Sequence, residues 1–234
     1  LGSKSKIKKI SFTGDKIYKN AKLRSIILSE EYKFWKFISG KKYLNEELVE
    51  FDTQLLKNFY LNKGHYNVNI NTSFAKLISE NEFELIYNVQ PNKRYFFNFL
   101  NLNLPNDHDK NNYKKIFKLF NDLKVQPYSI NSIDKILDLI DEIIINEQYD
   151  SIKATVDQNI NENKIDLIFE IKETEKLFIE RINISGNNIT DEKVIRNQLE
   201  IDEGDPFNDI LHNKSINNLK NLNFFKKVTS NISP

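Results

Sequence analysis

The side chains that could support catalysis are few and scattered. The three histidines, His65, His108 and His212, lie far apart, and their spacing matches no metal-ligand pattern. The chain has no cysteine, which excludes disulfides, thiolate metal sites and a cysteine nucleophile. Its carboxylates are dispersed, no glycine-rich phosphate loop is present, and no hydroxyl lies near a plausible base. The sequence therefore predicts no catalytic residue, no metal and no cofactor, and we expect a protein that is not an enzyme.

The charge balance argues against a general nucleic-acid binder. The chain has 34 Lys and Arg against 33 Asp and Glu, a net charge of +1, whereas phosphate binding usually needs a basic excess. A single-stranded nucleic-acid-binding repeat protein is an alternative from another class, because several lysines lie near aromatic residues and could combine charge with stacking. These lysines are Lys8, Lys9, Lys41, Lys42, Lys114 and Lys115. Acidic residues offset them, so we expect no nucleic-acid partner.

The chain shows no membrane-spanning segment in its sequence. No apolar run approaches the roughly 20 residues that a spanning helix needs. Leu1-Gly2-Ser3 is typical of a cloning scar rather than of a signal peptide. We therefore expect a soluble piece of a longer protein, with a tag scar and leader over residues 1–5.

An internal repeat organises the rest of the chain. Residues 83–102 align without gaps with residues 165–184 at an offset of 82, and nearly every apolar position meets another apolar residue. Residues 8–16 resemble residues 180–188 at an offset of 172, which the middle copy divides into 90 and 82. Three copies therefore begin near residues 8, 98 and 180. The predicted modules span residues 6–94, 95–176 and 177–234.

Each copy shows the same order of hydrophobic periods. In the first copy a short alternating strand precedes a short helix near residues 23–27. A longer helix begins after Asn45 and ends at Gly64, and two alternating strands, 68–72 and 83–89, close the copy. This order predicts an α+β fold of three tandem βααββ modules, each a three-stranded mixed sheet with two helices on one face. The third module is expected to lack its last strand.

A sheet edge is the candidate binding surface. A three-stranded sheet leaves two edges with unpaired N–H and C=O groups, which can accept an added strand. In the first module we expect the second strand to be the exposed edge, where outward asparagines keep it soluble. The candidate residues are Val68, Asn69, Ile70, Asn71 and Thr72. An ordinary polar edge without a partner is the alternative.

Three short motifs carry a resemblance to a known family. Residues 34–43 (FWKFISGKKY) form a Trp-rich insertion with a glycine, and residues 52–65 follow the spacing D-x-x-x-L-x-x-x-Y-x-x-x-G, with His65 in place of a usual aromatic. Residues 219–228 (LKNLNFFKKV) are similar to an L-x-x-L-G-F-F-x-x-V ending, with Asn223 where glycine is usual. These motifs resemble the third and fifth periplasmic POTRA repeats of the BamA family of outer-membrane β-barrel assembly proteins. The middle copy, with Leu104-Pro105 in place of a glycine turn, resembles the fourth.

The resemblance implies a function and partners. It implies a periplasmic portion of a Gram-negative outer-membrane protein, attached to a C-terminal membrane β-barrel and acting as a scaffold with chaperone-like character. Its sheet edges would bind nascent outer-membrane proteins and accessory lipoproteins by strand addition and deliver the substrates to the barrel. The edge Val68–Thr72 would contact a BamB-like lipoprotein and nascent strands. Glu203 aligns with the acidic residue through which the fifth repeat engages a BamD-like lipoprotein.

Two alternatives stay open at this point. Glu203 lies beside Asp202 and Asp205, so it could equally be a solvated loop carboxylate. The chain could also be the POTRA region of another superfamily member, such as the TamA translocation factor or a chloroplast import pore. The insertion at residues 34–43 favours the BamA family.

Overall fold

The structure is a computed structural model, and it describes residues 5–33, 41, 43, 45–79, 81–147, 149, 152–222, 224–225 and 227–233. Most of the Trp-rich insertion, residues 34–40 and 42, lies outside the described residues. The chain divides into two compact units. One consists of Leu1–Phe99, Leu123–Ile133 and Asn159–Asp166, and the other of Leu100–Asp122, Asp134–Gln158 and Leu167–Pro234.

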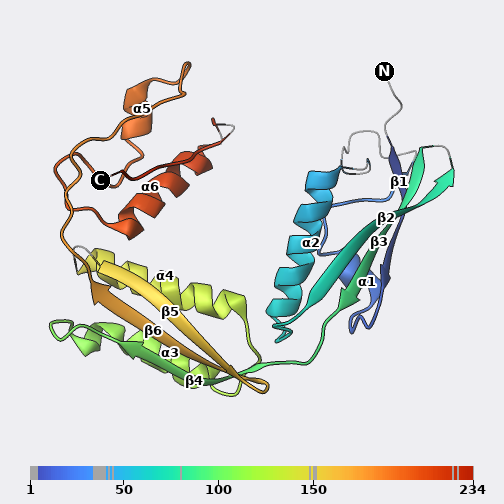
Figure 1. Cartoon of the computed structure of the whole chain (residues 1–234), viewed down its shortest axis with the longest axis horizontal. Helices are drawn as coiled ribbons and strands as arrows, with labels where there is room; N and C mark the ends of the chain where they lie inside the picture. Colours follow the sequence, from blue (N-terminus) through green and yellow to red (C-terminus); the bar gives the residue numbers. More distant parts are fainter. Residues whose placement is uncertain are drawn as a thin grey trace. The chain divides into compact units, whose positions relative to one another are not determined.

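The first sheet has the expected three strands in the order β1-β3-β2 (Figure 1). Strand β1 spans Lys6–Thr13 and runs parallel to β3, Glu82–Gln90, while β2, Asn69–Ser79, runs antiparallel to β3. Helices α1, Asn20–Arg24, and α2, Glu46–Leu61, lie between β1 and β2 in the sequence. The central strand is therefore the last one of the module, and both earlier strands are edges.

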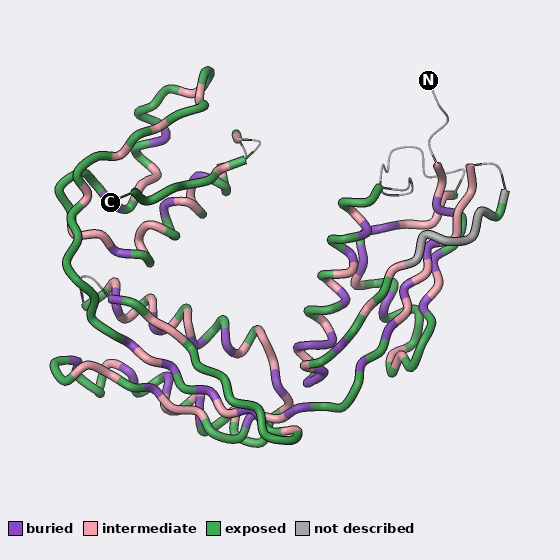
Figure 2. Tube along the Cα trace, in the orientation of Figure 1, coloured by how far each residue is buried: buried purple, intermediate pink, exposed green. Residues whose placement is uncertain are grey.

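The alternation of apolar residues decides which face of this sheet is covered. Ile7, Ile10 and Phe12 of β1 are buried, as are Leu85 and Tyr87 of β3. Ile10 pairs with Leu85 and Phe12 with Tyr87, so these side chains share one face, and buried and more exposed positions alternate along the strands (Figure 2). Helix α2 covers that face with its own apolar stripe. The side chain of Asn45 caps this helix by accepting from Leu48 N at 3.3 Å, as its sequence predicts.

The second sheet repeats this plan with the order β4-β6-β5. Its strands are β4, Phe96–Asn103, β5, Ile152–Asn161, and β6, Lys164–Glu173. A 3-10 turn, η2 (Lys110–Tyr113), leads into α3, Lys114–Leu123, and α4 follows at Ile130–Asn146. Phe120 of α3 stacks on Phe169 of β6 at 5.6 Å between ring centroids, so a helix covers the apolar face of this sheet as well.

The third copy has its two helices but no sheet in the part of the chain that the structure describes. Helix α5 spans Glu192–Arg196 and α6 spans Asp209–Asn221. The residues expected to form its opening strand, 180–184, are not assigned to a strand. A strand exists only with a neighbour that shares its ladder of hydrogen bonds, and no second strand lies beside these residues in the described range. The two helices agree with the predicted fold, whereas neither of the two strands expected in this copy, at 180–184 and after α6, is assigned among the described residues.

Isolated bridges show that the three copies are equivalent. Each copy joins its opening segment to the residue three positions before its second helix, through Lys6–Tyr43, Phe96–Pro127 and Phe178–Pro206. The first partners, Lys6, Phe96 and Phe178, follow one another at the two offsets that the sequence alignment predicts. The repeat is therefore structural, and not an accident of composition.

Candidate protein-binding surfaces

The predicted binding strand lies at an outer position of the first sheet. Residues 69–72 belong to β2, which pairs on one side only, with β3. Asn69 and Asn71 are exposed, Ile70 and Thr72 are half-buried, and Val68 is buried just before the strand begins. Within the described part of the chain, nothing bonds to the outer side of Asn69–Thr72. The edge position is thus observed, and the binding role stays a prediction.

The opposite edge, along β1, is covered by the chain itself. Ile7 O accepts from Tyr32 N at 2.6 Å, and Phe12 O accepts from Lys16 Nζ at 2.5 Å. Between them, Ile10 N donates to Glu31 Oε1 at 3.0 Å, and Ile10 O accepts from Arg24 Nη2 at 2.7 Å. The two edges of this sheet therefore differ in how far their outward main-chain groups are already satisfied.

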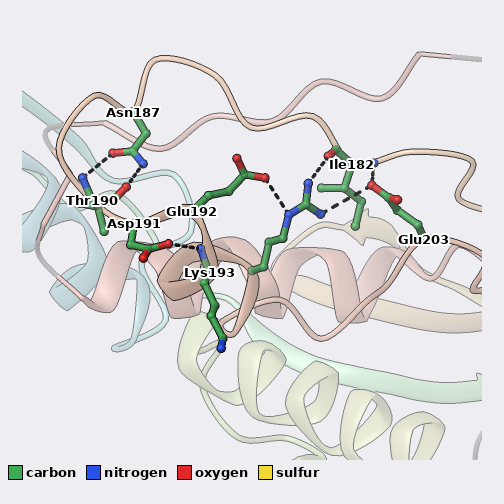
Figure 3. A network of polar contacts seen from close by, with 8 residues as sticks. Ile182, Asn187, Thr190, Asp191, Glu192, Lys193 and Glu203 are labelled. Atoms are coloured by element: carbon green, nitrogen blue, oxygen red, sulfur yellow. Dashed lines mark hydrogen bonds and ion pairs between the residues drawn. The ribbon is translucent and has the colours of Figure 1, made fainter.

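Glu203 takes part in a polar network in the third copy (Figure 3). Its Oε1 accepts from Ile182 N at 2.9 Å and lies 3.6 Å from Arg196 Nη1. Arg196 Nη2 donates to Ile182 O at 3.1 Å, and Arg196 Nε donates to Glu192 Oε1 at 2.8 Å. The carboxylates of Glu192 and Glu203 raise the pKa of Arg196, which keeps it charged. Glu203 is therefore held in place by its own module, although its side chain remains 45% exposed.

The same network occurs in the first copy. Arg24, Glu31 and Ile10 correspond to Arg196, Glu203 and Ile182 at the offset that relates the first copy to the third, with the same donors and acceptors. Arg24 Nη2 lies 2.8 Å from Glu31 Oε1, and the Glu31 side chain is only 22% exposed. Our sequence reasoning missed this pair. The signal was present as an arginine followed seven positions later by a glutamate, once in each of the two copies.

A second recurring contact lies inside the modules. Asp52 of α2 is fully buried and accepts from Leu28 N at 2.6 Å, from Ser29 N at 3.1 Å and from Tyr87 Oη at 3.0 Å. Burial and the neighbouring carboxylate raise the pKa of Tyr87, so its hydroxyl stays a donor. In the third copy the buried hydroxyl of Ser215 accepts from Glu200 N at 2.8 Å, in the equivalent place. These contacts tie the loop after the first helix to the second helix.

The three histidines lie in different surroundings. His65 and His108 are buried, and burial lowers the pKa of both, while His212 lies beside Phe207. Among the described residues, no group of three or more histidines, aspartates or glutamates is placed to hold a metal ion. None of the helices in this described part of the chain is long and apolar enough to span a membrane.

A family model and several curated proteins match this chain. The POTRA model, described as a surface antigen variable number repeat, matches residues 5–92 and 177–234. Outer membrane protein assembly factor BamA of Buchnera aphidicola is 29% identical over 237 residues, covering 97% of this chain and 37% of the relative. BamA of Neorickettsia risticii is 25% identical, covering 95% of this chain and 30% of the relative. The chain thus spans about a third of the length of these relatives.

Solved structures show the same fold. The crystal structure of Haemophilus influenzae BamA POTRA3-5 superposes with a TM-score of 0.65 at 16% identity, covering 99% of this chain and 91% of that one. BamA of Haemophilus ducreyi lacking POTRA domains 1-3 gives a TM-score of 0.52 at 9% identity, over 72% of this chain and 29% of that one. At these identities the likeness establishes the architecture.

Proposed function

The chain belongs to the POTRA family, whose repeats in BamA lie in the periplasm, and from this premise we propose that it is a scaffold for outer-membrane protein assembly. In this role it binds extended segments of nascent outer-membrane proteins and hands them to a membrane-embedded barrel in the full-length protein. The similarity to BamA over nearly the whole chain supports this function over that of TamA or an import pore.

The observation that carries the proposal is the difference between the two edges of the first sheet. Strand β2 pairs with β3 only, and its outer side at Asn69–Thr72 meets no bonding group of the described chain, whereas the outer side of β1 is covered. Main-chain hydrogen bonds formed along β2 would give affinity that depends little on side-chain identity. Such affinity suits a scaffold that must accept many unrelated substrates.

Accessory lipoproteins are the second class of proposed partner. A BamB-like lipoprotein would compete for the β2 edge, and a BamD-like lipoprotein would contact Glu203. Support for the second contact comes from exposure, because the Glu203 side chain is about twice as exposed as that of its counterpart Glu31, and its ion pair with arginine is longer, 3.6 Å against 2.8 Å. A cationic partner group could therefore reach the carboxylate at Glu203 more easily than at Glu31.

Site-specific photo-crosslinking tests the β2 edge. With benzoylphenylalanine at Asn69 or Asn71 of the full-length protein in cells, we expect capture of outer-membrane precursors and of a lipoprotein. The matched controls are Lys9 and Thr13, which are exposed on β1. Because the β1 edge is already bonded, its capture yield should be roughly tenfold lower. Equal yields at both edges, or capture of unrelated periplasmic proteins alone, would count against the proposal.

Charge reversal tests Glu203, and Glu31 provides the control for structural damage. Glu203→Lys and Glu31→Lys each lose the bond to an isoleucine amide and an arginine partner. We expect Glu203→Lys to weaken binding of the purified BamD-like lipoprotein roughly tenfold or more, and Glu31→Lys to leave it nearly unchanged. Isothermal titration calorimetry measures both. An unchanged affinity in Glu203→Lys, or an equal loss in Glu31→Lys, contradicts the assignment.

A further inference from the structure

The side chains of Arg24 and Glu31 bond to both main-chain groups of Ile10 on the outer edge of β1. We propose that this pair is an edge guard, which keeps an extended polypeptide from adding to β1 and so leaves β2 as the edge that takes the strand. The inference rests on the proposed strand-binding function and deepens it, because it names the residues that choose the edge.

The geometry of Ile10 supports the guard. Strand β1 is parallel to β3, and in a parallel strand the N–H and C=O of one residue point to the same side. Ile10 N donates to Glu31 at 3.0 Å and Ile10 O accepts from Arg24 at 2.7 Å, so both groups point away from β3. An incoming strand would need these two groups, and it would have to displace both side chains to reach them.

The ion pair between the two side chains makes this displacement costly. Arg24 Nη2 lies 2.8 Å from Glu31 Oε1, so each side chain holds the other over the strand. Charge-assisted hydrogen bonds are stronger than the neutral main-chain bonds that an added strand would offer in return. On either side, Tyr32 N bonds to Ile7 O and Lys16 Nζ bonds to Phe12 O, so the cover extends along the strand.

The recurrence of the pair in the third copy argues for a selected arrangement. Arg196 and Glu203 hold Ile182 through the same atoms at the equivalent place in the third copy (Figure 3). A surface ion pair contributes little to stability by itself, yet in both copies it lies across the main chain of the segment that opens the copy, which is strand β1 in the first copy. In the first copy this segment is the edge strand β1, and proteins often protect such edges with charged side chains.

The test removes the guard and follows the edge it covers. The double variant Arg24→Ala/Glu31→Ala is made in the whole chain, with benzoylphenylalanine at Lys9 or Thr13. The probe is a synthetic seven-residue peptide of alternating valine and threonine. We expect its crosslinking to β1 to rise roughly tenfold, because two main-chain groups become available to it, while crosslinking at Asn71 of β2 stays constant. Sedimentation velocity should show new concentration-dependent self-association through the opened edge.

A matched control separates the guard from a general loss of surface charge. Glu170 and Lys172 on β6 form an ion pair at 2.7 Å, and among the described residues neither side chain bonds to the main chain of β1 or β4. Glu170→Ala/Lys172→Ala should leave both crosslinking yields unchanged. A double variant at Arg24 and Glu31 that folds, stays monomeric and gives no added crosslinking at β1 overturns the guard. If the chain with an intact guard gives no crosslinking from Asn69 or Asn71 of β2, the proposed function is overturned instead.

A measurement on the wild-type chain keeps the guard testable if the variant does not fold. The Ile10 amide is outward on an edge strand, yet the guard requires that its hydrogen exchange be slow. We expect it to exchange at least roughly tenfold more slowly than the outward amides of Asn69–Thr72, because it is bonded to Glu31. Equal exchange rates at the two edges overturn the guard.

Discussion

Asp52→Ala is expected to lower the opening free energy of the first module by about 3 kcal/mol, because it leaves buried donors without an acceptor. The Asp52 carboxylate is fully buried and accepts from Leu28 N, Ser29 N and Tyr87 Oη. These donors come from the loop after α1 and from the central strand β3. The Asp52 side chain therefore connects α2, the loop and β3. Its loss should free the loop that also carries Glu31 of the edge guard.

The measurement must resolve a single module, because a chain of several units has no single free energy of unfolding. Native-state hydrogen exchange in urea, read by mass spectrometry on peptides of α2 and β3, gives the opening free energy locally. Tyr87→Phe removes one donor and leaves the other two bonded, so we expect a smaller loss, about 1 kcal/mol. Losses of equal size in the two variants would contradict the role of Asp52 as a shared acceptor.

Asp52 also shows how far sequence reasoning reaches. Its position within a spaced motif was visible, but a carboxylate in a helix is usually solvated, and only the fold shows that it is buried. The equivalent position in the third copy is Ser215, which accepts one amide instead of two. The two copies use different side chains to accept the main-chain N–H groups of the loop after the first helix. A comparison of the repeats by residue type could therefore not reveal this shared contact.

The elements were predictable for a different reason. Hydrophobic periods of 2 and 3.6 predict strands and helices. The offsets between the copies predict equivalent positions, and the first partners of the isolated bridges follow these offsets. The two strands expected in the third copy were the exception, since neither residues 180–184 nor the described residues after α6 form a strand, and no ladder partner lies beside residues 180–184 in the described range. A hydrophobic period predicts which face of a segment is apolar, but the segment forms a strand only if a neighbouring strand shares its hydrogen bonds.

The candidate binding surfaces were only half predictable from the sequence. Alternation and polar side chains at Asn69 and Asn71 indicated an edge, and the structure places that segment at the edge. Nothing in the local pattern showed that the other edge, along β1, is covered. That cover comes from side chains 14 and 21 residues beyond Ile10, which approach β1 only after α1 turns the chain back. Which of the two sheet edges is open therefore depends on tertiary contacts and not on the local sequence.

Gly14→Ala is the second change for which we expect a large effect, a loss of about 3 kcal/mol in the opening free energy of the first module. Gly14 follows β1 at φ +82°, where an L residue is strained, and an added Cβ would lie 2.4 Å from Val89 O and 2.9 Å from the Asn88 side chain. The main chain of β1 and β3 would have to separate at this end. That separation should also disturb the pairing of Thr13 with Asn88.

The repeat supplies the control for Gly14 within the same chain. Gly186 occupies the equivalent position in the third copy at φ +75°, but an added Cβ there meets nothing within 4 Å. Gly186→Ala should therefore show the conformational strain alone, about 1 kcal/mol, measured by hydrogen exchange on peptides around α5. The difference between the two variants isolates the close approach of β1 to β3. If the two alanine variants lose the same opening free energy, backbone strain explains the whole effect. The close approach to Val89 O would then contribute nothing measurable.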